Sequence, residues 1–273
     1  MSSPADRTGE GLAWQRGIWD RYPETYRSEV DTRFASVVAQ VIARAGLAPG
    51  YRVLDLGTGT GSVALRAAPL VLPDGGVLGV DISPAMLVVA GQQATKAGLA
   101  HVRFQEGCAE AIPARDATFH VVLASLSLMY AVDRAAAARE IARVLRPGGR
   151  LVAAVWAGPG QCDIVLFQQT AGRFAPPPPV PDVGPGALAD ATPFLGRLAE
   201  AGIEAHVETE VLGFDFPDFA SAWNVLAGVT TAKLPPERQQ EAKAAVLTRL
   251  WPHGDGPRHF RNLTQFIVGQ WSA

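Results

Sequence analysis

The sequence predicts an α/β protein organised around a doubly wound, mostly parallel β-sheet. Short apolar runs at residues 51–56, 77–80, 119–124 and 150–156 alternate with segments of helical periodicity. The loops between them are short and rich in glycine and proline. Hydrophobic residues make up 48% of the 273-residue chain, which is enough for one large core.

The composition disfavours several classes of function. A formal net charge of −2 gives no basic surface for nucleic acid or for an acidic membrane. The two cysteines, Cys108 and Cys162, form neither a disulfide framework nor a metal site, so a reducing cytoplasm is expected. The polar first eleven residues predict no signal peptide, and no apolar run approaches the roughly 18 residues that span a bilayer. The oligomeric state stays open.

Residues 1–29 are expected to form a flexible N-terminus. This segment carries four aromatic residues: Trp14, Trp19, Tyr22 and Tyr26. They are either core anchors of an N-terminal helix or a lid over a bound ligand. From residue 31 to residue 45 the apolar side chains recur at helical spacing, and Gly46 ends that helix.

The stretch from Val53 to Gly61 organises the rest of the chain. It reads V-L-D-L-G-T-G-T-G, a short strand followed by a glycine-rich turn, and a helical pattern begins at Ser62. Glycines at alternate positions let the chain turn tightly and leave no Cβ between backbone and ligand. The following helix offers unpaired N–H groups and a positive dipole end. The alternative is a strand–helix turn that binds nothing.

This loop differs from the common nucleotide-binding loops. Ser62 stands where the nicotinamide fingerprint G-x-G-x-x-G has its third small residue, and the G-K-[ST] of a P-loop is missing. Asp55 precedes the loop at the end of the strand, where a carboxylate would repel a pyrophosphate. By Coulomb attraction it favours a ligand with a cationic near end.

A second acidic residue follows the next strand. Asp81 ends the apolar run 77–80, roughly 20 residues beyond the loop, where a βαβ unit places an acid against ribose hydroxyls. Alternatively, it is a helix N-terminal acid, because Ser83-Pro84 is a strong helix start. Met86 lies early enough in that helix to touch the base of a nucleoside.

The following elements complete the predicted parallel sheet. Residues 101–105 alternate polar and apolar, as an edge strand does. A strand at 119–124 precedes Ser125–Tyr130, which therefore lies outside a strand's carboxyl end, where open α/β sheets bind ligands. An amphipathic helix around 138–145 ends at Pro147.

The second half of the chain begins with loop signals after Trp156. Further elements are expected at 188–201 (helix), 206–216 (strand), 219–229 and 236–251 (helices) and 264–271 (strand). Aromatic and aliphatic residues from both halves are candidates for the wall of an apolar substrate pocket, or for ordinary core: Met129, Tyr130, Phe167, Phe174, Trp223 and Leu226.

These motifs together resemble the class I S-adenosylmethionine-dependent methyltransferases. The resemblance rests on the glycine loop, Asp81, Glu106-Gly107-x-Ala109-Glu110, the L-M-Y at 128–130 and the R-V-L-R-P-G-G-R-L turn. It is strongest for the small-molecule branch, with its quinone-biosynthesis and natural-product methyltransferases. It implies a seven-stranded Rossmann-like sheet whose last strand is antiparallel, a methyltransferase domain over 30–273, a possible lid in 1–29 and a helical cap insertion at about 217–257.

The resemblance also implies which residues contact S-adenosylmethionine, or its product S-adenosylhomocysteine. They are Asp55, Gly57, Thr58, Gly59 and Ser125 at the methionine end, Asp81 at the ribose, and Ile82, Met86, Cys108 and Ala109 at the adenine. Cys108 departs from the family, which commonly has an acid there, and a thiol is a weak acceptor. His120 also departs from the family, but at the start of its strand it is expected to be structural.

The expected reaction is methyl transfer to an O, N or C atom of a small, apolar or aromatic molecule. Tyr130, His253 and His259 are candidates for a general base, which a protonated acceptor would require. Three alternatives remain: a protein that binds the cofactor without transfer, as a sensor or a cyclisation scaffold; a nicotinamide oxidoreductase; and a nucleic-acid methyltransferase. Asp55 and Ser62 disfavour the nicotinamide oxidoreductase, and the net charge of −2 disfavours the nucleic-acid methyltransferase.

Overall fold

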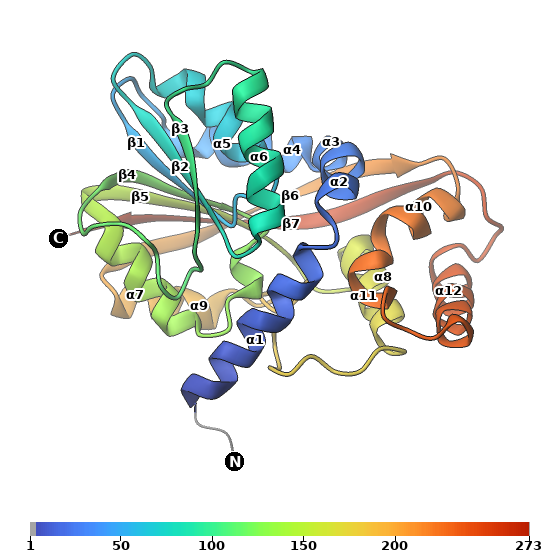
Figure 1. Cartoon of the computed structure of the whole chain (residues 1–273). Helices are drawn as coiled ribbons and strands as arrows, with labels where there is room; N and C mark the ends of the chain where they lie inside the picture. Colours follow the sequence, from blue (N-terminus) through green and yellow to red (C-terminus); the bar gives the residue numbers. More distant parts are fainter. Residues whose placement is uncertain (1–3, 273) are drawn as a thin grey trace.

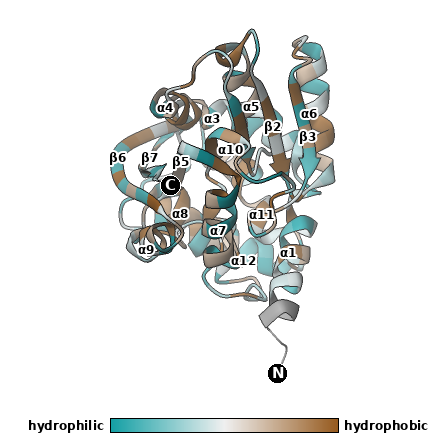
Figure 2. Ribbon diagram, turned by 90° about the vertical axis from the view of Figure 1, so that its left-hand side faces the viewer, coloured by the Kyte–Doolittle hydropathy of each residue, from teal (hydrophilic) through white to brown (hydrophobic). Residues whose placement is uncertain are grey.

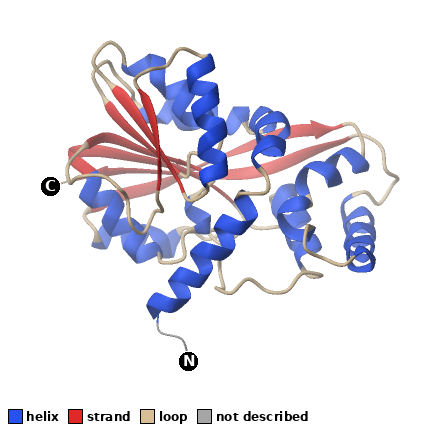
Figure 3. Cartoon of the chain, in the orientation of Figure 1, coloured by secondary structure: helices blue, strands red, loops and turns tan. Residues whose placement is uncertain are grey.

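The computed structural model describes residues 4–272 and contains the predicted sheet, with helices on both sides (Figures 1 and 3). Its seven strands lie in the order β3-β2-β1-β4-β5-β7-β6. The strands are β1 Arg52–Leu56, β2 Gly76–Asp81, β3 Val102–Glu106, β4 Phe119–Ser125, β5 Leu145–Trp156, β6 Ile203–Phe216 and β7 Arg258–Trp271. The doubly wound, mostly parallel sheet predicted from the sequence is thus confirmed.

Strand β1 lies at the point where the strand order reverses. Its Val53 pairs in parallel with Val77 of β2 on one side and with Val121 of β4 on the other. The chain winds outward to β3 from one side of β1 and to β5 from the other, so a crevice opens outside the carboxyl ends of β1 and β4. Strand β7 is antiparallel to both of its neighbours, β5 and β6.

Two layers of helices cover the sheet, since its central strands are apolar on both faces. In Figure 2 the ribbon of β2 is hydrophobic, whereas α6 and α7 carry both colours, as amphipathic helices do. One layer comprises α4 Ala35–Ala45, α5 Ser62–Ala67 with the short η2 Ala68–Val71, and α6 Pro84–Lys96; the other comprises α7 Arg134–Val144 and α9 Thr192–Glu200. Over residues 4–272, none of the helices has the length and apolar character that crossing a bilayer requires.

The N-terminal segment contains the helix that one interpretation of its aromatic residues expected, and this helix begins at Pro4, within the stretch expected to be flexible. Helix α1 spans Pro4–Trp19 and crosses in front of the sheet at the carboxyl ends of its strands (Figure 1). Short turns lead from it to α4: α2 Pro23–Thr25, the π-helical turn η1 Tyr26–Val30 and α3 Asp31–Arg33. Three glycines and many polar residues weaken the local helical signal of α1. Its position in the fold therefore depends on its contacts with segments distant in the sequence.

Helices also fill the two long connections around β6 and β7. Between these strands lie α10 Phe219–Leu226, α11 Gly228–Thr231 and α12 Pro236–Leu250, close to the predicted bounds. Helix α8, Asp163–Gly172, was not predicted. Its start is fixed from β7, because the Asn262 side chain accepts the Ile164 N–H at 3.0 Å and Arg258 pairs with Asp163. Strand β7 begins six residues earlier than expected, which lengthens the hairpin.

An aromatic cluster joins the β6–β7 hairpin to these helices. Phe260 of β7 is fully buried, and its ring centroid lies 5.2 Å from Phe216, 5.7 Å from Trp251 and 6.4 Å from Phe167. Large buried aromatic side chains dominate core energetics. This cluster therefore fixes α8 and α12 to the sheet.

Replacement of Phe260 by alanine should lower the free energy of unfolding by about 3–5 kcal/mol, because it removes a buried ring that its neighbours cannot replace. Denaturant titration followed by circular dichroism measures the change. Val211→Ala on β6, at a side chain that is 52% exposed, is the control and should stay within about 0.5 kcal/mol of wild type. Equal effects of the two substitutions would contradict this account of the cluster.

Candidate active site

The glycine loop leaves β1 at Leu56 and folds under the end of β2. The N–H groups of Gly57 and Thr58 both donate to the carbonyl of Val80, at 2.8 and 2.9 Å. Gly57 has a φ of +73°, and a Cβ on it would lie 2.3 Å from the Cβ of Ser127. The Ser127 hydroxyl donates to the Leu56 carbonyl at 2.6 Å. Glycine at 57 is thus required by both the backbone angle and the close approach.

Asp55 lies beneath this loop. Its side chain is 1% exposed, and Oδ2 accepts the Thr58 hydroxyl at 2.6 Å and the Ala64 N–H at 3.0 Å. Burial raises the pKa of Asp55 from its ordinary 3.8 to about 7. Neither Asp55 nor Thr58 lines the pocket in front of the loop. The structure therefore places the acid as an anchor of the loop and of the start of α5, whereas the sequence argument had it facing the ligand.

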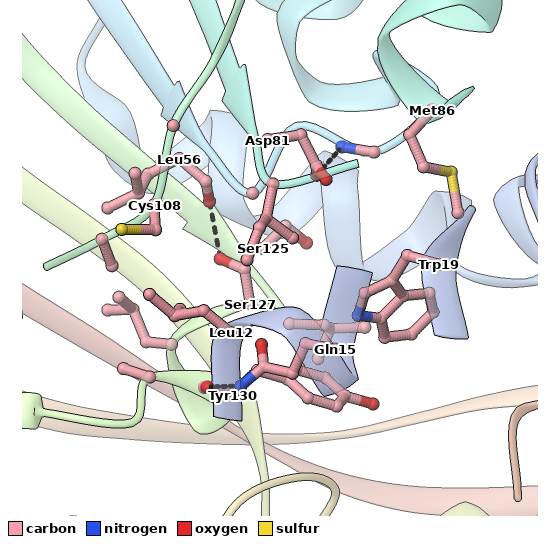
Figure 4. A pocket seen from close by; sticks show the side chains of 18 of the residues that line it. Leu12, Gln15, Trp19, Leu56, Asp81, Met86, Cys108, Ser125, Ser127 and Tyr130 are labelled. Carbon is pink, nitrogen blue, oxygen red and sulfur yellow. Dashed lines mark hydrogen bonds between the residues drawn. The ribbon is translucent and has the colours of Figure 1, made fainter. Parts of the chain in front are cut away.

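Asp81 lies at the end of β2 and faces the crevice. One carboxylate oxygen accepts the N–H of Gly59 at 2.8 Å, the bond drawn from Asp81 in Figure 4, and the other accepts the N–H of Ser83 at 2.9 Å. Burial raises the pKa of Asp81, while its hydrogen bonds to backbone N–H groups oppose the shift. The carboxylate thus ties the glycine loop to β2 and also lines the pocket.

The first pocket occupies the crevice predicted outside the carboxyl ends of the strands. It encloses about 750 Å³ of empty space, part of which is open to solvent. Most of the predicted cofactor residues line it: Gly57, Gly59, Asp81, Ile82, Met86, Cys108, Ala109 and Ser125. Lining residues that the sequence did not single out include Gly107 and Glu110 after β3 and Ser127 after β4.

Helix α1 forms the outer wall of this pocket (Figure 4). Leu12, Gln15 and Trp19 line it, and only Trp19 had a signal in the sequence, as an aromatic residue in a segment weighed as a lid. The Gln15 amide donates to the Tyr130 carbonyl at 2.6 Å. Asp20, just beyond α1, accepts the Ser83 hydroxyl at 2.6 Å.

Two further contacts hold α1 in this place. Arg16 forms an ion pair with Glu106 at the end of β3. Gly11 packs closely on the loop that precedes α9, where a Cβ would lie 2.8 Å from Val180. The helix is therefore connected to segments that follow β2, β3 and β4.

A second pocket of about 490 Å³ adjoins the first. The two share Trp19, Tyr26, Leu126 and Tyr130. The walls of the second pocket are mainly aromatic and aliphatic: the shared residues together with Tyr22, Val30, Phe34, Met129, Trp156, Ile164, Gln168, Pro185, Val225, Leu226 and Val229. Of the predicted wall residues, Met129, Tyr130 and Leu226 lie there.

The other predicted wall residues lie elsewhere. Phe167 is fully buried in the aromatic cluster, and the Trp223 ring packs on it at 6.1 Å. Arg238 of α12 lies over the ring of Phe174. These three residues line neither pocket, because α8 and the helices between β6 and β7 use them for packing among themselves.

The three candidate bases are separated by the fold. Tyr130 borders both pockets, and burial raises its pKa, so the hydroxyl keeps its proton. His259 contacts Asp215 at 2.8 Å across the β6–β7 hairpin, and His253 lies in the exposed loop after α12; neither lines a pocket. His120 is structural, as expected: it stacks on Tyr51 at 4.5 Å and accepts the Arg52 N–H at 3.0 Å.

The raised pKa of Asp55 should make stability depend on pH. Between about pH 4 and pH 7 the folded state keeps a proton that the unfolded state has lost, so the free energy of unfolding falls as pH rises, by up to about 1.4 kcal/mol per unit. The Asp55→Asn variant carries an amide that does not titrate, so it lacks this pH-dependent contribution to stability. Denaturant titrations of both proteins should show the difference, wild type minus variant, falling until about pH 7 and constant above it. A difference independent of pH would show that Asp55 is ionised in the folded protein.

Replacement of Gly57 by alanine should destabilise the protein by several kcal/mol, since it adds a steric clash of about 1–3 kcal/mol to the cost of a positive φ. Gly98→Ala is a matched control, because Gly98 has a φ of +69° with no atom within 4 Å of the added Cβ. It should cost about 1 kcal/mol. Thermal unfolding of the two variants separates the clash from the backbone strain, and equal losses would refute the role of the Ser127 contact.

The chain is similar in sequence to known methyltransferases. Residues 47–159 match the family model of a methyltransferase domain. The chain is 34% identical over 217 residues to the 27-O-demethylrifamycin SV methyltransferase of Amycolatopsis mediterranei, covering 78% of this chain and 74% of that protein. It is 38% identical over 120 residues to the ubiquinone/menaquinone biosynthesis C-methyltransferase of Ectopseudomonas mendocina, covering 44% of this chain and 47% of that protein.

The fold is also similar to that of solved structures. The YcgJ protein of Bacillus subtilis superposes with a TM-score of 0.65 at 23% identity, covering 88% of this chain and 99% of that one. The chain spans about half the length of several other curated relatives, 55% for three mycobacterial proteins that are 32% identical. The extent of the match to the rifamycin enzyme decides the assignment, and the chain belongs to the S-adenosylmethionine-dependent methyltransferases.

Proposed function

We propose that this protein transfers a methyl group from S-adenosylmethionine, held in the first pocket, to an O, N or C atom of a small apolar or aromatic molecule in the second. The observation that carries the proposal is the shared wall. Trp19, Tyr26, Leu126 and Tyr130 border both pockets, so molecules in the two pockets would meet there. The first pocket has two acidic residues, Asp81 and Glu110, and the bare backbone of glycines on its wall, whereas the wall of the second pocket is mainly apolar.

The residues of the first pocket fit the cofactor. Gly57 presents no Cβ, Asp81 presents a carboxylate suited to ribose hydroxyls, and Ile82 and Met86 present apolar surface for an adenine. Asp55 and Thr58 would act indirectly, by holding the loop. The cofactor would supply a methyl group already activated by a sulfonium charge, so the chain's task is alignment and exclusion of water.

Tyr130 is proposed to orient the acceptor and not to remove its proton, because its raised pKa keeps the hydroxyl neutral. We also propose that residues 30–273 form the methyltransferase domain, with 1–29 as a lid and about 217–257 as a cap. The two free cysteines support a cytoplasmic location, and the net charge supports a partner other than nucleic acid.

Calorimetric titration with S-adenosylhomocysteine tests the cofactor site. Asp81→Ala removes the proposed charged hydrogen bond to the ribose and should weaken binding roughly ten- to a hundredfold. Asp31→Asn is the control: Asp31 accepts the Thr60 hydroxyl of the same loop at 2.5 Å but does not line the pocket. That variant should bind within about threefold of wild type.

Three outcomes would contradict the proposal or a part of it. A wild-type protein that does not bind S-adenosylhomocysteine would remove the cofactor from it. Equal losses in the Asp81 and Asp31 variants would mean that Asp81 acts only through the loop. Tight binding without methyl transfer to any apolar acceptor would favour the alternative of a binding protein without turnover.

A further inference from the structure

Among the fully buried polar side-chain atoms in the wall of the second pocket, one has no hydrogen-bond partner in the described chain. The hydroxyl of Tyr22 is buried and makes no hydrogen bond with any residue of the described chain, while the side chain as a whole is 9% exposed and lines the pocket. Gln168, the amide in the same wall, is satisfied: Nε2 donates to the Leu226 carbonyl at 2.8 Å, and Oε1 accepts the Thr230 hydroxyl. A buried hydroxyl without a partner is rare and costs free energy.

The Tyr22 ring is held in this place by its surroundings. Its backbone N–H donates to the Trp19 carbonyl at 3.1 Å, and its carbonyl accepts the Tyr26 N–H at 2.9 Å. Gly228 at the start of α11 packs against the ring, since a Cβ there would lie 2.9 Å from Cε2. The hydroxyl therefore cannot easily turn toward bulk water to find a partner.

The charge state of the wall restricts what can bind. None of the lining residues of this pocket is a carboxylate, an imidazole, an amine or a guanidinium. Burial, followed by the nearby charge of Glu29, raises the pKa of Tyr22 to about 12, so its hydroxyl is a neutral hydrogen-bond donor at physiological pH. A charged ligand would lose its hydration here without gaining an opposite charge.

We propose that Tyr22 is a specificity-determining residue whose hydroxyl donates a hydrogen bond to a carbonyl or ether oxygen of an uncharged, otherwise apolar acceptor. This rests on the proposed function, because it takes the second pocket as the acceptor site. The apolar wall selects the body of the molecule, and Tyr22 selects its oxygen. A site built to hydrogen-bond an oxygen discriminates against the analogue that lacks it, because the hydroxyl then stays unpaired.

Three probes of similar size separate these requirements: acetophenone, ethylbenzene and benzoate. Ligand-observed NMR titrations, with S-adenosylhomocysteine saturating, should show acetophenone binding to wild type about tenfold more tightly than ethylbenzene, and benzoate binding most weakly. Tyr22→Phe should lose about tenfold in acetophenone affinity and keep the ethylbenzene affinity within about twofold. The control Tyr51→Phe removes a hydroxyl outside both pockets and should change neither.

Thermal unfolding gives a second readout. Tyr22→Phe should unfold at the wild-type midpoint or above it, since the variant removes an unpaired buried hydroxyl; a hydroxyl with a structural role would lower the midpoint. Should that variant fail to fold, Gly228→Ala displaces the ring and should cause the same selective loss for acetophenone. Unchanged acetophenone affinity in both variants would overturn the proposal.

The remaining outcomes distinguish a failure of the Tyr22 proposal from a failure of the proposed function on which it rests. If wild type binds S-adenosylhomocysteine but none of the probes, or prefers benzoate, the uncharged apolar acceptor is wrong and the cofactor assignment stands. If wild type binds no S-adenosylhomocysteine, the proposed function itself fails, whatever the probes do.

Discussion

The buried carboxylate of Asp55 is the interaction on which the geometry of the site depends. One oxygen joins the end of β1 to the glycine loop through Thr58 and to the start of α5 through Ala64. A carboxyl group without solvent is costly, which is why its pKa rises, and its hydrogen bonds offset part of that cost. The fixed loop brings Gly57 against Ser127 and Gly59 against Asp81. The ends of three strands, β1, β2 and β4, are thereby held in one arrangement around the crevice.

The topology explains why two pockets meet at this point. Reversal of the strand order at β1 opens the crevice, and the segments after β2, β3 and β4 supply most of the wall of the first pocket. The second pocket needs elements from outside this core: Tyr22 and Val30 from the N-terminal turns, Ile164 from α8, and residues of α10 and α11. The sheet determines where chemistry can occur, and the peripheral helices determine what reaches it.

Local signals were sufficient for the part of the first pocket that the strand ends build, and insufficient for its α1 wall and for most of the second pocket. The glycine loop, the acid at the end of β2 and the residues after β4 were predictable, because each depends on a strand end and a few neighbouring residues. Helix α8 was missed because Asn262 and Arg258, far along the chain, fix its start. An N-terminal helix carrying the aromatic residues was one of the alternatives, but its start at Pro4 and its place against the first pocket could not be predicted, because Glu106 and Tyr130, far along the chain, hold it. Phe167 and Trp223 were expected in a pocket wall, but their hydrophobicity fits a helix interface equally well, and only the tertiary packing distinguishes the two.

The contacts of α1 link the two pockets thermodynamically. The helix supplies Trp19 to both walls, and its attachments include an ion pair whose side chains are 45% and 49% exposed. Such surface pairs contribute little free energy, so the docked helix is only weakly held by them. A molecule that contacts Trp19 in one pocket would stabilise the docked position of α1. A molecule that enters the other pocket would then bind to a wall that is already ordered. If both pockets bind ligands as proposed, occupancy of one pocket and affinity in the other would be coupled, and reciprocity would require the coupling to be equal in both directions.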